Sequence, residues 1–105
     1  MDELIARLEQ ATGPNRELDH AVETAVLGEW TYYAPEYTAS IDAALTLVPE
    51  GFNWTVDGFP SGPACASCYL ADAGGQLHDG ATPAIAICIA SLKARQAMAN
   101  PQRDL

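Results

Sequence analysis

The hydrophobic positions of the first 28 residues recur at three- and four-residue spacing, which is the period of an amphipathic helix. One stripe predicts a helix over residues 3–11, with Asp2 as its N-cap. A second stripe predicts a helix over residues 16–27 that ends at Gly28. We expect the polar side chains of this second helix to face water: Glu17, Asp19, His20, Glu23 and Thr24.

An aromatic segment without a clear period follows, over residues 29–37. Its large rings are expected to lie across the apolar face of the fold, because rings of this size bury much apolar area. Exposure of part of the cluster as a contact surface is the alternative. The rings concerned are Trp30, Tyr32, Tyr33 and Tyr37.

A third helix is predicted over residues 39–48, capped by Thr38 or Ser40, with Ile41, Ala44, Leu45 and Val48 facing inward. Strict alternation then predicts a strand over residues 52–56, with Phe52, Trp54 and Val56 on one face. A turn-rich loop would return the chain as an antiparallel strand over residues 64–71, and a short third strand is expected near residues 76–78.

The last element is a helix over residues 84–99, for which Thr82 is the N-cap and Pro83 the first helical position. Its apolar stripe is broadened by Ile87, which indicates a helix lying centrally on the sheet. The elements together predict a single α+β domain over residues 1–105. Two or three short antiparallel strands are covered by helices in an α/β/α-like sandwich with two N-terminal helices.

Charge is distributed unevenly along the chain, whose formal net charge is -9. Residues 17–92 contain no Lys or Arg, and the basic residues all fall near the ends. Carboxylates without nearby counter-charges are expected mostly to face water, because burying an unpaired charge is costly. Such a surface repels nucleic acid and anionic membrane and attracts basic proteins. A role in solubility alone is the plainer alternative.

Candidate catalytic and metal-binding residues are few. Cys65 and Cys68 are expected to be reduced and, three positions apart in a strand, to point to opposite faces. Cys88 is expected in the core. The pair Cys65 and Cys68 has no second pair of zinc ligands at suitable spacing, and it does not open a helix as a redox pair does. We therefore expect no metal, no cofactor and no catalytic residue. A general base formed by His78 and Asp79 is a weaker alternative.

No stretch is long and apolar enough for a membrane span, and the acidic N-terminus is unlike a secretory signal. The expected location is therefore the cytoplasm. Oligomeric state is left open.

Two segments of the chain carry a resemblance to a known family. They are residues 37–44, YTASIDAA, and residues 81–94, ATPAIAICIASLKA, with Trp54 in the strand between them. From about residue 35 to 96 the chain resembles the phage ABA-sandwich family of small phage and prophage proteins. The resemblance implies a layered helix and sheet fold and a phage origin, and it transfers no catalytic residues.

A phage origin and an acidic surface together suggest an inhibitor of host defence, by analogy with small acidic anti-CRISPR proteins. The expected partner is a basic, nucleic-acid-binding protein of the host bacterial cell, with a CRISPR effector complex as the suspected target. The chain would act as a DNA mimic that blocks DNA access and would not itself bind nucleic acid. The expected contact residues are Glu29, Glu36, Asp42, Asp57, Asp72 and Asp79.

The sequence is compatible with three other functions. The chain could be a sponge for a signalling nucleotide held at the helix starts near Thr38 and Thr82, although the lack of nearby cations argues against a phosphate-rich ligand. It could be a phage accessory protein of another activity. A small hydrolase centred on His78 and Asp79 ranks last.

Overall fold

A computed structural model describes residues 2–29, 33–58, 63–69 and 76–99 of the chain. Within these ranges the chain forms four helices and one three-stranded antiparallel sheet of order β1-β2-β3, which confirms the predicted α+β class. The elements are α1 (Asp2–Gln10), α2 (Arg16–Leu27), α3 (Ile41–Leu45), β1 (Asn53–Asp57), β2 (Ala64–Tyr69), β3 (His78–Gly80) and α4 (Pro83–Ala99).

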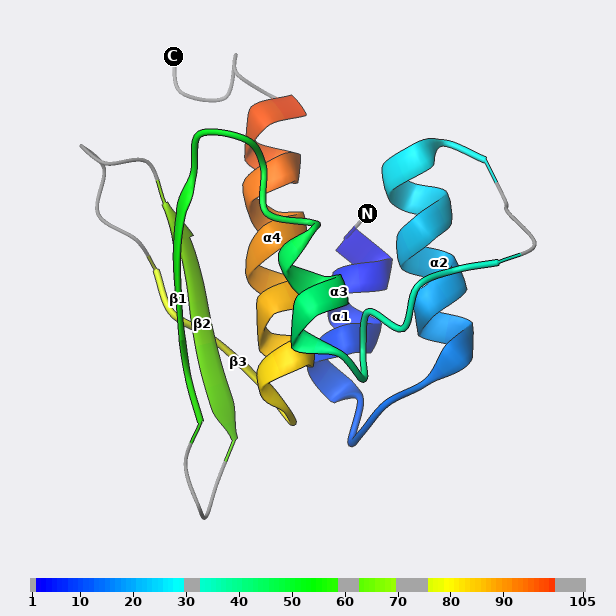
Figure 1. Ribbon diagram of the computed structural model, residues 1–105, viewed down its shortest axis with the longest axis horizontal. Coiled ribbons are helices and arrows are strands. Elements are labelled where there is room, and N and C mark those ends of the chain that lie inside the picture. Colours follow the sequence, from blue (N-terminus) through cyan, green and yellow to red (C-terminus); the bar gives the residue numbers. More distant parts are fainter. Residues whose placement is uncertain (1, 30–32, 59–62, 70–75, 100–105) are drawn as a thin grey trace.

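The four described helices lie on the same side of the sheet (Figure 1). α4 packs on β2 and β3, while α1 and α3 pack on α4, and α2 packs on α1. The layers therefore run from the sheet to α4, then to α1 and α3. The described helices are therefore gathered against one face of the sheet, an arrangement consistent with the predicted α+β sandwich.

α4 is the centre of the core. Every residue from Ala84 to Leu92 is buried, including Cys88 and Ser91. A helix that is apolar all round is stable when other elements surround it, and the sheet on one side with α1 and α3 on the other do so here. The predicted central helix and its Thr82 cap are confirmed, since Thr82 Oγ1 accepts a hydrogen bond from the Ile85 amide at 3.2 Å.

The N-terminal helices closely follow their sequence pattern. Leu4, Ile5 and Leu8 of α1 are buried, and Gly28 ends α2 in the left-handed conformation with φ 84°. The third helix is shorter than predicted, and Ser40 caps it by accepting from the Ala43 amide. Thr38 is fully buried and bonded to α2, so it does not serve as the cap.

The strands differ from prediction in their limits. β1 ends one residue later than expected, at Asp57, and β3 lies two residues beyond the expected position. Cys68 Sγ lies 3.6 Å from Ser91 Oγ of α4, which identifies the sheet face that carries Cys68 as the inner one. Register then places Trp54 on the inner face, opposite Cys68. The end of the predicted second strand, beyond Tyr69, lies outside the described residues.

One helix is too narrow to cover three strands. An α-helix with its side chains is about 10 Å across and neighbouring strands are about 5 Å apart, so α4 covers roughly two strands. β1 lies at the sheet edge, past the helix, and its burial pattern is largely exposed. Trp54, predicted to face inward, keeps 45% of its surface exposed for this reason, and Ile41 of α3 keeps 43%.

The close approach of β3 to α4 depends on Gly80. A Cβ atom at this position would lie 2.6 Å from the Ala86 amide nitrogen and 2.9 Å from Ala86 Cα. These are backbone atoms of the buried helix, which have no room to move aside. β3 therefore packs on α4 only with a glycine here.

Replacement of Gly80 by alanine is expected to lower the free energy of unfolding by about 1–3 kcal/mol, the usual cost of overpacking a core. Gly13→Ala is the matched control, since a Cβ there meets no atom within 4 Å. Urea unfolding of both variants measures the difference. Equal stability of the two would contradict the proposed close packing.

Candidate functional site

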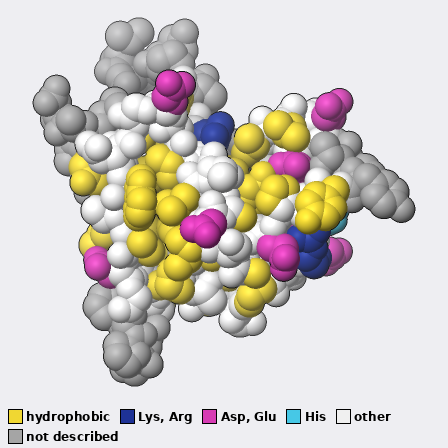
Figure 2. Space-filling view, in the orientation of Figure 1, with side chains coloured by type: hydrophobic (Ala, Val, Ile, Leu, Met, Phe, Trp, Pro, Cys, Tyr) yellow, Lys and Arg dark blue, Asp and Glu magenta, His cyan; other side chains and the backbone are white. Residues whose placement is uncertain are grey.

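The acids proposed as contact residues fall into separate groups. Asp57 and Asp79 belong to the sheet. Asp42 lies in α3, Glu36 lies in the segment before α3, and Glu29 follows the end of α2. The sheet and α2 lie at opposite sides of the molecule (Figure 1). Asp72 lies outside the described residues. The structure thus does not gather this set on one side, and Figure 2 shows acidic side chains separated by other types.

Asp57 and Asp79 share one sheet face. Register places Asp57 opposite Cys65 and Cys65 opposite Asp79, so the three side chains point the same way. This is the outer face, because Cys68, three positions from Cys65, points to α4. Two strand spacings separate the two carboxylates by on the order of 10 Å. Asp57 and Asp79 are named the sheet-face pair below.

Besides the sheet-face pair, the outer sheet face carries Asn53, Thr55 and Ser67 together with Cys65 and Tyr69. Asn53 and Thr55 of β1 point outward with Asp57, and both are exposed. None of the described helices packs on this face. The predicted strands, over residues 52–56 and 76–78, stop one residue before Asp57 and Asp79. In the structure both residues lie in strands, which fix the direction in which their side chains leave the backbone.

Two acids that were expected to face water are instead buried. Asp19 is 1% exposed and Glu23 is 8% exposed, both on α2. Asp19 Oδ1 accepts from the amide and from Oγ1 of Thr38, each at 2.8 Å, and its Oδ2 accepts from Arg16 at 3.0 Å. These donors satisfy the carboxylate oxygens, which compensates for the water that Asp19 loses on burial. The prediction for Asp19 was wrong because Arg16, three positions earlier, is its counter-charge.

Glu23 forms a second hydrogen-bonded contact between α2 and the segment that follows it, after the contact of Asp19 with Thr38. Tyr37 Oη donates to Glu23 Oε1 at 2.5 Å, and the Cys88 thiol donates to the Tyr37 carbonyl at 3.3 Å. Burial, together with the hydrogen bond to Glu23, raises the pKa of the Tyr37 phenol. The aromatic segment is therefore divided, since Tyr37 is buried while Tyr33 is 79% exposed. Trp30 and Tyr32 lie outside the described residues.

The described cations are largely engaged within the chain. Arg16 also donates to the Ala34 carbonyl at 2.9 Å, Lys93 pairs with Glu9 at 3.3 Å, and Arg95 Nε donates to the Leu47 carbonyl at 2.7 Å. None of these contacts involves an exposed acid of residues 17–92. Those exposed acids are Glu17, Glu29, Glu36, Asp42, Glu50, Asp57 and Asp79.

The cysteines match the structural interpretation made from the sequence. All three are free, and Cys65 and Cys68 point to opposite sheet faces. Burial raises the pKa of the Cys68 thiol, and burial with the nearby Asp19 charge raises that of Cys88 to about 12. A thiol with so high a pKa is a poor nucleophile. Among the described residues no group of three or more His, Cys, Asp or Glu side chains is placed to hold a metal ion.

His78 and Asp79 do not form a catalytic pair. They are neighbours in β3, and His78 lies on the inner face, opposite Ala66, while Asp79 lies on the outer face. Burial, with the charge of Lys93, lowers the pKa of His78. The hydrolase alternative loses its proposed general base and orienting carboxylate.

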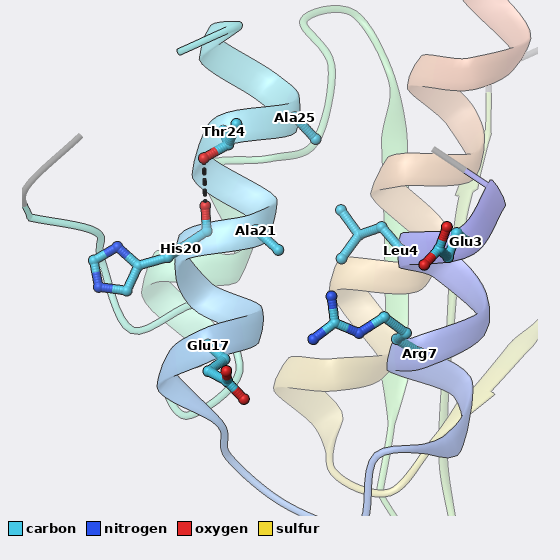
Figure 3. A pocket seen from close by; sticks show the side chains of 8 residues that line it. All are labelled: Glu3, Leu4, Arg7, Glu17, His20, Ala21, Thr24 and Ala25. Carbon is cyan, nitrogen blue, oxygen red and sulfur yellow. Dashed lines mark hydrogen bonds between the residues drawn. The ribbon is translucent and has the colours of Figure 1, made fainter. Parts of the chain in front are cut away.

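An open pocket of about 680 Å³ lies between α1 and α2. In Figure 3, Arg7 extends from α1 toward α2, Leu4 and Ala21 face each other across the gap, and His20 points away from α1. Glu3 and Glu17 also line it, so its single cation is accompanied by two carboxylates. This charge is unfavourable for a nucleotide.

The helix starts proposed for anion binding already have internal partners. Thr38 is bonded to Asp19, and the amide of Ile85 at the start of α4 donates to Thr82. Neither the pocket nor the helix starts favour the nucleotide sponge.

Comparison with known proteins gives no match: no family model, curated protein or solved structure is similar to this chain. No helix among the described residues has the length and apolar character to cross a membrane.

Substitution of Asp19 by alanine is expected to lower the free energy of unfolding by about 2–4 kcal/mol, because the buried amide and hydroxyl of Thr38 lose their acceptor, while half-exposed Arg16 is hydrated instead. Thr38→Val, which removes one donor and keeps the shape, should cost about 1–2 kcal/mol. The control is Glu17→Ala, an exposed acid on the same helix, with an expected change within about 0.5 kcal/mol. A loss for Asp19→Ala no larger than the control's would show that the carboxylate is not held as described.

The lowered pKa of His78 predicts a pH dependence of stability. In the unfolded chain His78 titrates near its ordinary pKa of 6.5, and in the folded chain below it. The unfolded state then binds more protons in the interval between the two, so the free energy of unfolding falls as pH decreases through that interval. Unfolding in urea across this range should show a weaker fall for His78→Gln than for the native chain. Parallel curves for the two proteins would refute the prediction.

Proposed function

We propose that this chain is a non-enzymatic protein that binds a basic, nucleic-acid-binding partner through exposed carboxylates. The observation that carries the proposal is the set of exposed acids outside the α1–α2 pocket. Among the described cations, Arg16 and Lys93 pair with Asp19 and Glu9, Arg95 binds a carbonyl, and Arg7 lies at that pocket with Glu17. Unpaired surface carboxylates create a negative potential that attracts cationic partners and increases their association rate.

The sheet-face pair is the part of this surface that we assign to the partner. Strands hold Asp57 and Asp79 in one direction, on a face that no described helix covers. Fixed side chains lose little conformational entropy on binding. Glu29, at the far side of the molecule, does not belong to this contact. Glu36 and Asp42 contribute to the overall negative field.

In its most specific form, the proposal is a phage-encoded inhibitor of a CRISPR effector complex that prevents DNA from binding. The phage origin and this target are supported by the sequence resemblance and the class analogy alone. Electrostatic attraction supports the more general proposal, which is binding to a basic host protein. The proposed place of action is the cytoplasm. We propose no cofactor, metal or catalytic residue.

The test is binding of the chain to a purified, DNA-free CRISPR effector complex at several salt concentrations. We expect affinity to fall as salt increases, and the double variant Asp57→Lys with Asp79→Lys to bind roughly tenfold more weakly or worse. Glu29→Lys with Glu36→Lys makes the same charge change away from the sheet and should have a much smaller effect. DNA binding by the complex serves as the second readout.

Binding that is independent of salt, or equally affected by both double variants, would refute the role of the sheet-face pair. Absence of binding to every effector complex tested, with salt-dependent binding to another basic host protein, would remove the CRISPR target and keep the general proposal.

A further inference from the structure

The inner side of β1 leaves apolar surface uncovered. Trp54 is 45% exposed and Val56 is partly exposed, and both belong to the face of β1 that points toward the helices. On α3, Ile41 is 43% exposed, and Leu45, one helical turn later, is partly exposed. Figure 2 shows hydrophobic side chains gathered over the space between β1 and α3. We name Ile41, Leu45, Trp54 and Val56 the β1 edge surface.

β1 is also an edge strand, since the sheet order is β1-β2-β3 and β2 pairs with only one of its sides. Among the described residues no strand pairs with the other side. A strand edge presents backbone donors and acceptors that an extended chain can bind. The sequence of β1 favours such pairing, because Trp54, Thr55 and Val56 are good strand formers and Pro or Lys, which protect edges, are absent from it.

The charges around β1 specify what kind of chain would bind. Asp57 and Asp79 lie on the outer sheet face, and Asp42 is exposed in α3, next to Ile41 of the β1 edge surface. A second copy of this chain would bring like charges together, with a formal net charge of -9 on each copy. A segment with cationic side chains gains attraction where a second copy meets repulsion.

We propose that β1 accepts an extended, basic segment of the partner protein as a fourth strand. Because side chains of a strand alternate between faces, apolar side chains of that segment pack on the β1 edge surface, and its Lys or Arg side chains lie on the outer face beside Asp57. Asp79, on the third strand, lies roughly 14 Å from the added strand and contributes only to the negative field there. This inference deepens the proposed function by naming the site of contact and the chemistry of the bound segment.

The experiment uses a capped seven-residue peptide of alternating lysine and valine. Titration of the isotope-labelled chain is expected to shift the amide signals of β1 and α3, and calorimetry gives the affinity. A peptide with the same sequence but N-methylated at all five central residues, so that both backbone edges lose their donors, keeps the charge and should bind at least tenfold more weakly. A glutamate and valine peptide should not bind.

Trp54→Ala is expected to weaken peptide binding about tenfold or more, because it removes the largest exposed apolar side chain of the β1 edge surface. Leu77→Ala is the matched control, since Leu77 is 59% exposed and lies next to the opposite edge strand. Equal affinity of the N-methylated and unmodified peptides, or signal shifts away from β1 and α3, would overturn the inference. Concentration-dependent dimerisation of the chain alone through β1 would also overturn it.

Failure of this inference can be distinguished from failure of the proposed function. Salt-dependent binding to the effector complex that Trp54→Ala leaves unchanged would refute strand addition and leave the electrostatic function standing. Peptide binding at β1 without binding to any effector complex would support strand addition and refute the effector complex as the target.

Discussion

Five cations for fourteen carboxylates is the constraint that shapes this molecule. A buried carboxylate needs a counter-charge or several donors, and Arg16 with Thr38 supplies both for Asp19. Lys93 pairs with Glu9, and Arg95 binds a backbone carbonyl. With its cations placed in this way, the chain neutralises few of its other acids. Apart from Glu23, which is buried and bound by Tyr37, the other described acids lie in water. The negative surface is thus a consequence of how the fold uses its positive charges.

The apolar side of the same surface has a geometric origin. α4 is buried on every side, between the sheet and the helices α1 and α3, and it covers about two strands. β1 is the strand left at the edge, and Trp54 is the large side chain that remains partly uncovered there. An edge strand with an apolar side, a polar side and acids around it combines the features of a site for an extended basic chain.

The main elements could be predicted from sequence because local patterns determine them. The stripes of α1, α2 and α4, the glycine after α2 and the alternation of β1 depend on neighbouring residues only. Burial of Asp19 could not be predicted with the same rules, since its donors include Thr38, which lies 19 positions away. The Arg16 to Asp19 spacing was the one local signal available, because oppositely charged residues three apart meet on a helix.

The candidate site was less predictable than the fold. The acids of residues 17–92 were visible as a group, but their division between sheet, α3 and α2 depends on tertiary packing. Asp57 and Asp79 share a face only through strand register, which places both opposite Cys65. Exposure of Trp54 and Ile41 depends on the width of α4, a property of the assembled layers. The alternation in β1 correctly predicts that Trp54 lies on the inner face. It does not indicate how many strands α4 covers.

The local electrostatic potential measured by nuclear magnetic resonance tests the central claim most directly. Relaxation of each amide proton is compared in the presence of a cationic and an anionic paramagnetic cosolute of the same size. The account predicts the strongest excess of the cationic probe at the amides around Asp57 and Asp79, and a weaker one near Arg7 on α1. Equal enrichment of the two probes around the sheet-face pair would contradict it.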